Sequence, residues 1–268
     1  MKLHIFHTGK VRVDIAIPLH EKNPTAKLGL FRSKKKKVDL PVSSCLIEHG
    51  DHKVLVDTGW DSKYAEEKPK QFLGLLNKVS APLIKKEEAI DHRLSALGIK
   101  DSDLDYVVYT HLDFDHTSGT RLVKDAKCFL ASKKEIVDAS KSGFRNIKSD
   151  WEMVKLTGFE FLETGIGPVG KSYDLYGDGK IVLVSTPGHS LGHLSVILNG
   201  DDGKYLVIAG DAAYVPESYK NKIIPGFSVN GKLVMKSLEW LIQCKDDDNC
   251  LGVLANHDPS VEEGVIEI

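Results

Sequence analysis

The sequence has few cysteines and no long apolar run. Four cysteines occur in 268 residues, and no two of them have CxxC spacing, so we assign none a catalytic role. No apolar stretch approaches the ~18 residues that span a bilayer. The first residues are too few and too polar for the apolar region of a signal peptide. These absences predict a cytoplasmic protein that does not interact with membranes.

The sequence also lacks an excess of either charge. The formal net charge is −2, which gives no reason to expect nucleic acid as a partner. Apolar residues make up 41% and charged residues 28%, as in ordinary soluble globular proteins. One basic run, Lys34–Lys37, is either a solvated loop or a positive rim that attracts an acidic substrate. With no internal repeat and no low-complexity linker, we expect a single domain over residues 1–268.

Short apolar runs alternate with helical patterns along the chain. Leu46–Glu48 and Lys53–Asp57 flank a His-Gly-Asp turn and predict a hairpin. Helices are predicted over Ile84–Leu97, from about Ser132, and over Leu233–Gln243. Further strands are predicted at Tyr106–Tyr109, Ala126–Ala131, Ile181–Ser185, Leu194–Leu198, Tyr205–Ala209 and Leu251–Ala255. This order favours an α/β fold of mixed sheets covered by helices, either a layered sandwich or a doubly wound sheet.

Four of these predicted strands end in residues that bind metals. The residues that follow them are His111–His116, His189, Asp211 and His257. Ligands at several strand ends can meet at one rim of a sheet, where loops carry function on a rigid scaffold. The sequence therefore predicts a metal site at such a rim.

The segment His111–His116 is the densest group of candidate ligands. Four of its six residues, His111, Asp113, Asp115 and His116, can bind metal. The alternative is a helix start that is rich in capping residues. Capping accounts for Asp115 or Thr117, but it does not account for two histidines and a second aspartate in the same turn. The pattern therefore favours two ions held close together.

The other strand ends supply fewer candidates. His189 directly follows a Pro-Gly turn, so it is the predicted ligand, whereas His193 is expected to support the site from behind. Asp211 follows Gly210, which allows close backbone approach, and can bridge two cations. His257 is either a surface histidine or a ligand. Asp57 is interpreted as an organiser of the ligand turns and not as a ligand.

These motifs together resemble the metallo-β-lactamase superfamily. The motifs that occur in that family's order are Asp57-Thr58-Gly59, His111-x-Asp113-x-Asp115-His116, Thr186-Pro187-Gly188-His189, Gly210-Asp211 and His257. The resemblance implies an αββα sandwich of two mixed sheets flanked by helices, with two metals, usually zinc, at one edge. It assigns His111, Asp113 and His189 to the first metal, Asp115, His116 and His257 to the second, and Asp211 to both.

Within the superfamily the chain most resembles the N-acyl-homoserine lactonase branch. Asp211-Ala212-Ala213-Tyr214 is similar to that branch's bridging aspartate followed by a substrate-contacting tyrosine. Tyr214 is otherwise a packed tyrosine with a satisfied hydroxyl. The resemblance implies that hydroxide generated by the metals opens a lactone ring. Tyr214 would then bind the oxyanion, and Asp115 would carry the proton to the leaving alkoxide.

Asp113 departs from the family pattern, which normally has histidine at this position. Asp113, Asp115, Asp211 and a bridging hydroxide would together cancel the four charges of two divalent ions. A carboxylate oxygen is a harder Lewis base than an imidazole nitrogen. We therefore hypothesise that Asp113 shifts the metal preference of the first site from zinc toward iron or manganese.

Other interpretations keep the fold but change the function. The same site suits a thioester or phosphodiester hydrolase, and the fold also suits a metal-binding sensor or scaffold without catalysis. The segment from Lys63 to Ile84 is interpreted either as a helical flap over the site or as an oligomer contact, which would make the protein a homodimer. The expected partner in the enzyme interpretations is a small ester or lactone.

Overall fold

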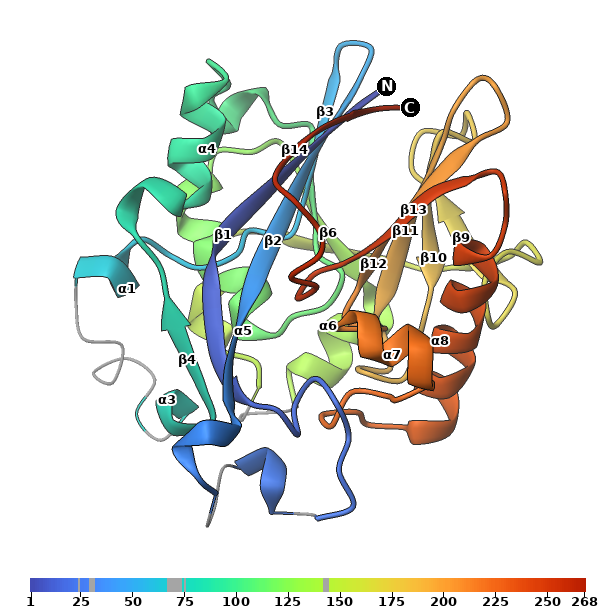
Figure 1. Cartoon of the computed structure of the whole chain (residues 1–268). Helices are drawn as coiled ribbons and strands as arrows, with labels where there is room; N and C mark the ends of the chain where they lie inside the picture. Colours follow the sequence, from blue (N-terminus) through green and yellow to red (C-terminus); the bar gives the residue numbers. More distant parts are fainter. Residues whose placement is uncertain (24, 29–31, 67–73, 75, 142–144) are drawn as a thin grey trace.

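Two mixed β-sheets form the centre of the computed structural model, which describes residues 1–268 except 24, 29–31, 67–73, 75 and 142–144 (Figure 1). In spatial order, the first sheet contains β14 (Gly264–Glu267), β1 (Lys2–Asp14), β2 (Lys37–His49), β3 (His52–Val56), β5 (Tyr106–Val108), β6 (Phe129–Ser132) and β7 (Leu156–Phe159), with β4 (Ser80–Leu83) paired to β1. The second contains β13 (Cys250–Ala255), β12 (Tyr205–Gly210), β11 (Leu194–Asn199), β10 (Ile181–Ser185), β9 (Lys171–Asp174) and β8 (Leu162–Glu163).

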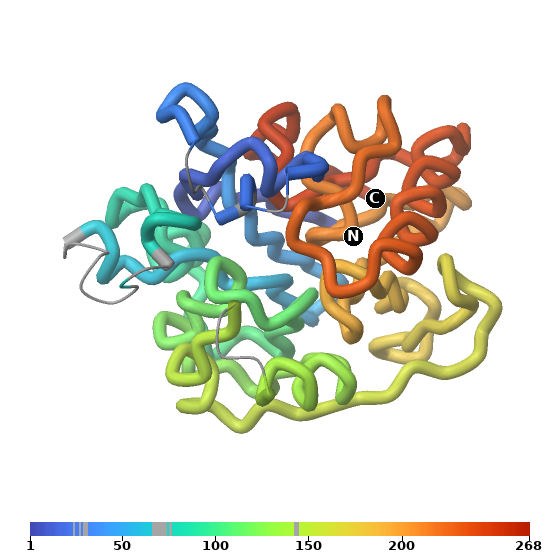
Figure 2. Tube along the Cα trace, turned by 90° about the horizontal axis from the view of Figure 1, so that it is seen from below, coloured from blue at the N-terminus to red at the C-terminus, as the bar shows by residue number. Residues whose placement is uncertain are grey.

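Helices cover the outer faces of both sheets. The α-helices are α1 (Lys63–Glu66), α3 (Leu76–Val79), α4 (Ile90–Ala96), α5 (Phe114–Thr117), α6 (Lys133–Ala139), α7 (Pro216–Asn221) and α8 (Gly231–Lys245). Short 3-10 turns cover Ala26–Leu28, Lys34–Lys36, Lys86–Glu88, Asp101–Asp103, Ser118–Val123 and Lys148–Asp150. Figure 2 shows α8 on one side of the molecule and α4 and α6 on the other. Within the described residues, no helix has the length and apolar character needed to cross a bilayer.

The alternation of side chains along the strands explains this layering. In β2, Cys45 and Ile47 point into the core between the two sheets, whereas Leu46 points outward and packs with Ile90 and Leu94 of α4. In β12, Ile208 points into the same inner core, and its neighbour Val207 packs outward under α8. Both sheets therefore bury both faces, and the predicted αββα sandwich is confirmed.

Most predicted elements form, but several boundaries differ; the strand predicted over Leu46–Glu48, for example, begins at Lys37. The helix predicted from Ile84 begins only at Ile90, because the preceding chain pairs with β1 as β4 and then makes a 3-10 turn over Lys86–Glu88. The strand predicted from Ala126 begins at Phe129, because Ala126 closes a turn onto Val123. The hairpin formed by β2 and β3 is confirmed.

The direction of the strands brings the candidate ligands to one edge. Strands β3, β5 and β6 run parallel to one another in the first sheet. Strands β10 and β12 both run antiparallel to β11, and β13 runs parallel to β12. The loops after β3, β5, β10, β12 and β13 therefore meet where the two sheets face each other.

Candidate metal centre

All of the predicted metal ligands lie buried at this edge. The seven side chains are His111, Asp113, Asp115, His116, His189, Asp211 and His257, and none is more than 9% exposed. The question of whether His257 is a surface histidine is therefore answered, since it is 1% exposed.

The ligand atoms form three overlapping groups. The groups are His111–Asp113–His189, His111–His116–Asp211 and Asp115–His116–His257, and within each group the candidate atoms lie within 4.8 Å of one another. We call the group around Asp113 and His189 the first half, and the group around Asp115, His116 and His257 the second half. Asp211 lies between them, with its Oδ1 3.4 Å from His116 Nε2 and its Oδ2 3.6 Å from His189 Nε2. This position is the one a carboxylate needs to contact ions on both sides.

Several buried atoms in the cluster have no hydrogen-bond partner among the described residues. They are Nε2 of His111, Nε2 of His116, Nδ1 of His189 and Oδ1 of Asp211. A buried polar atom without a partner costs roughly 1–3 kcal/mol, so such atoms are uncommon unless an ion or water satisfies them. The donor set of imidazole nitrogens and carboxylate oxygens is the one that divalent transition metals prefer. This part of the cluster therefore fits a metal ion.

Two neighbouring residues hold candidate ligands in position through hydrogen bonds. Asp57 has a φ of 59°, and from this left-handed conformation its carboxylate accepts hydrogen bonds from Thr110 N and from His116 Nδ1, both at 2.8 Å. His193 Nε2 accepts a hydrogen bond of 2.9 Å from the backbone N–H of Asp211. Asp57 and His193 therefore contact the candidate ligands, and their predicted roles as supports of a metal site stay predictions.

Arg145 is the first of two residues in the site that the sequence did not indicate. Its guanidinium lies against Asp113, with Nε and Nη2 at 2.9 and 2.5 Å from Asp113 Oδ2. Nη2 also donates to Nε2 of His189, and Nη1 donates to the backbone oxygen of His189 at 3.1 Å. The only indication in the sequence was the carboxylate at position 113, which needs a positive partner when it is buried.

Glu135 is a second residue that the sequence did not indicate. It lies near the start of α6, is 2% exposed, and accepts hydrogen bonds from the backbone N–H of Leu112 at 3.0 Å and from the hydroxyl of Ser190 at 2.5 Å. Leu112 lies between two candidate ligands, and Ser190 follows a third. Glu135 therefore ties the loop after β5 to the loop after β10.

The charges of the cluster change the ionisation of its members. Burial alone would raise the pKa of Asp113, but Arg145 and His111 hold it well below its ordinary value. Burial and Arg145 together lower the pKa of His189 to about 4, so this imidazole is neutral at physiological pH. Burial would lower the pKa of His116, yet the carboxylates of Asp211 and Asp57 raise it well above its ordinary value.

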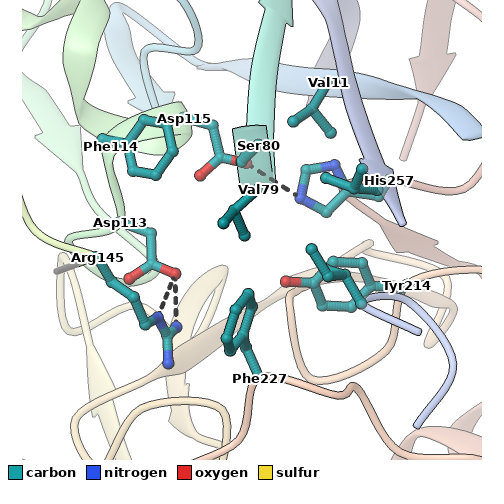
Figure 3. Close-up of a pocket in the computed structure, with 12 residues that line it drawn as sticks. Val11, Val79, Ser80, Asp113, Phe114, Asp115, Arg145, Tyr214, Phe227 and His257 are labelled. Carbon is teal, nitrogen blue, oxygen red and sulfur yellow. Dashed lines mark hydrogen bonds and ion pairs between the residues drawn. The ribbon is translucent and has the colours of Figure 1, made fainter. Parts of the chain in front are cut away.

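A pocket opens directly onto the cluster (Figure 3). Asp113, Arg145, Asp115, His257 and Tyr214 form its polar end, and the ring of Tyr214 stacks on His257 with centroids 4.7 Å apart. The hydroxyl of Tyr214 points into the space between the two carboxylates. Burial and then Asp211 raise the pKa of Tyr214 well above its ordinary value, so this hydroxyl keeps its proton.

The remaining walls of the pocket are apolar. They are formed by Val11, Val13, Ile17, Val79, Phe114 and Phe227, with Ser80 beside them. Val79 and Ser80 belong to the segment from Lys63 to Ile84, which therefore contributes to the pocket wall. Residues 67–73 and 75 of that segment lie outside the described residues, and the alternatives of a flap and an oligomer contact stay predictions.

A buried cluster of histidines and aspartates at the edge of a two-sheet sandwich is typical of metal-dependent hydrolases. The chain belongs to the metallo-β-lactamase superfamily, whose family model matches residues 38–251. It is 28% identical to the N-acyl homoserine lactonase AttM of Rhizobium radiobacter, over 82% of this chain and 83% of the relative. It is 25% identical to an N-acyl homoserine lactonase of a Bacillus species, over 85% of each chain.

Solved structures show the same fold. An N-acyl homoserine lactone hydrolase with N-hexanoyl-L-homoserine at its catalytic metal centre superimposes with a TM-score of 0.77 at 22% identity, covering 96% of this chain and 93% of the other. AidC, described as a dizinc quorum-quenching lactonase, superimposes with a TM-score of 0.67 at 15% identity and covers 99% of this chain and 90% of the other. The resemblance to the superfamily and its lactonases is confirmed.

Proposed function

We propose that this protein is a metal-dependent hydrolase that opens the lactone ring of an N-acyl-homoserine-lactone-like substrate. The observation that carries the proposal is the two-ended pocket. Its polar end places Asp115 and Tyr214 beside the candidate metal ligands, and its apolar walls are formed by residues such as Val11 and Phe227. A lactone carbonyl suits the polar end, and an acyl chain suits the apolar walls. Lactonase relatives of similar length support the same substrate class.

The metal would be held by side chains of the cluster. The candidate ligands are His111, Asp115, His116, Asp211 and His257, with Asp113 and His189 on the side of Arg145. When bound, divalent metal supplies a hydroxide nucleophile near neutral pH and polarises the carbonyl that is attacked. Zinc is the metal of the dizinc relative AidC, and the carboxylate of Asp113 makes manganese and iron the other two ions to test.

The side chains of the pocket would carry the remaining chemistry. Addition of hydroxide to the lactone carbonyl places negative charge on the carbonyl oxygen, and the protonated hydroxyl of Tyr214 can donate a hydrogen bond to it. Asp115 faces the pocket and can accept the proton of the attacking water. When the ring C–O bond breaks, Asp115 returns this proton to the leaving alkoxide, and the product is a hydroxy acid.

A thioester hydrolase with an anionic substrate is the second candidate function. The basic run Lys34–Lys37 is distant from the metal motifs in sequence. In the fold, however, Lys37 Nζ donates a hydrogen bond of 2.9 Å to the backbone oxygen of Lys78, whose neighbours Val79 and Ser80 line the pocket. This contact places positive charge beside the segment that lines the pocket, as the interpretation of a positive rim requires.

An activity panel tests the proposal. The protein is reconstituted in turn with zinc, manganese and iron, and is assayed with lactones, thioesters and bis(p-nitrophenyl) phosphate. Hydrolysis of acyl-homoserine lactones well above the other substrates is the expected result. A preference for thioesters or for the phosphodiester would refute the proposed substrate. Metal bound without hydrolysis of any member of the panel would instead support a sensor or scaffold.

A further inference from the structure

The two halves of the metal centre differ in what already fills them. In the half formed by Asp113 and His189, Nη2 of Arg145 lies 2.5 Å from Asp113 Oδ2 and donates to His189 Nε2. A metal ion would need to contact these same two atoms from about 2.0–2.2 Å. The guanidinium nitrogen therefore lies where an ion bound by Asp113 and His189 would lie.

The chemistry of His189 makes the two occupants mutually exclusive. A neutral imidazole has one acceptor nitrogen with a single lone pair. Because Arg145 donates to Nε2 of His189, that lone pair is already used. The side chain of Arg145 is also anchored at two further points, since Nε bonds Asp113 at 2.9 Å and Nη1 bonds the backbone oxygen of His189 at 3.1 Å. An ion can bind His189 Nε2 only if Nη2 leaves it, and the two further bonds hold the guanidinium against that movement.

In the part of the chain that the structure describes, no cationic side chain fills the other half in this way. Nε2 of His116 and Oδ1 of Asp211 are buried without a hydrogen-bond partner among the described residues, and they lie 3.4 Å apart. His257 Nε2 lies 3.5 Å from both Asp115 Oδ2 and Asp211 Oδ2. The ligand atoms of Asp115, His116 and His257 lie within 4.8 Å of one another, and Asp211 lies against both histidines. Two imidazoles and two carboxylates are therefore available to one divalent ion.

Charge gives a second argument. The three carboxylates of the cluster, Asp113, Asp115 and Asp211, carry three negative charges, and Arg145 carries one positive charge. The remaining two negative charges are neutralised by a single divalent ion. A second ion beside the guanidinium would bring two more positive charges to a carboxylate that is already paired.

We propose that the guanidinium of Arg145 takes the place of one of the two metal ions, so that the protein holds a single divalent ion between Asp115, His116, Asp211 and His257. This inference rests on the metal binding in the proposed function and does not depend on the lactone as substrate. It also changes the role of Asp113, which binds the arginine and not the metal.

Metal stoichiometry tests the inference without any activity assay. The protein is stripped with a chelator, incubated with excess zinc, desalted, and analysed by mass spectrometry for zinc per chain. The wild type should retain one equivalent. Arg145→Ala should retain two, because Asp113 and His189 then become free to bind. Arg12→Ala is the matched control, since Arg12 forms a similar two-point pair with Asp39 on the surface, and it should retain one equivalent.

The variant Arg145→Ala leaves Asp113 buried without its partner and can fail to fold. The double variant Asp113→His/Arg145→Ala removes both charges and restores the family's neutral ligand, and it should retain two equivalents. Two equivalents in the wild type would overturn the inference, as would one equivalent in both Arg145 variants. No zinc in any variant would overturn the proposed metal-dependent function together with the inference.

Discussion

The replacement Asp57→Asn should weaken metal binding even though Asp57 is not a ligand. The Asp57 carboxylate accepts a hydrogen bond of 2.8 Å from His116 Nδ1, which leaves the lone pair on His116 Nε2 free to bind an ion. An aspartate side chain has two acceptor oxygens, whereas asparagine has one acceptor oxygen and one NH₂ group, which donates. Its oxygen can keep the 2.8 Å bond from Thr110 N, and its NH₂ then faces His116.

The expected loss of metal affinity follows from the position of the proton on the His116 imidazole in the Asp57→Asn variant. If the amide donates to His116 Nδ1, the imidazole must carry its proton on Nε2 and must lose it before metal can bind. Loss of a hydrogen bond behind a metal ligand typically lowers metal affinity about 10–100-fold, or roughly 1.4–2.7 kcal/mol. Asparagine is the replacement to use because Asp57 has a φ of 59°, a conformation that asparagine adopts more readily than alanine.

The assay is competition for zinc between the protein and a chromophoric chelator, with melting temperatures of the metal-free proteins as a check on folding. Asp61→Asn is the control, because Asp61 is equally buried but pairs with Arg121 outside the cluster. Its zinc affinity should match the wild type. Unchanged zinc affinity in Asp57→Asn would refute the argument that the carboxylate sets the tautomer of His116.

Three further predictions concern the pocket, the cluster and stability. Tyr214→Phe keeps the ring stacked on His257 but removes the hydroxyl, so kcat should fall about 100-fold with unchanged metal content, and an unchanged kcat would exclude the oxyanion role. Asp211→Ala should lose metal and activity together, whereas normal metal content would contradict a ligand between the two halves. The pKa of Asp150 is raised to about 6 because burial outweighs Lys63, so ionisation opposes folding. The wild type should therefore lose up to about 3 kcal/mol of stability relative to Asp150→Asn between pH 4 and pH 7.5, as measured by urea unfolding. A difference that is constant with pH would refute this.

Local sequence was sufficient to identify the side chains that meet in the buried cluster. The motifs around His111, His189, Asp211 and His257 each follow a short apolar run, and each of these runs forms a strand of the structure. Once the strands run in the same direction, the residues after them must meet at one edge. The apolar runs left a layered sandwich and a doubly wound sheet open, and the resemblance to the superfamily favoured the αββα sandwich that the structure has.

Local sequence was not sufficient for boundaries that depend on pairing. The apolar residues at Ile84 and Ala126 continue the periodic patterns of their neighbours, so the patterns extend a helix and a strand too far. The pairing of β4 with β1 and the turn from Val123 to Ala126 end those elements. Both contacts are made by backbone hydrogen bonds. The spacing of apolar residues does not predict such bonds, so it could not place these two boundaries.

The sequence by itself determined which side chains form the buried histidine and aspartate cluster, because each candidate ligand is marked by a short motif at the end of a strand. Only the tertiary structure decided what Asp113 does. Arg145 lies in a different loop, 32 residues away, and its sequence neighbours show no pattern that points to the cluster. A buried carboxylate must be paired with positive charge, and the fold alone determines whether that charge comes from a metal ion or from a guanidinium.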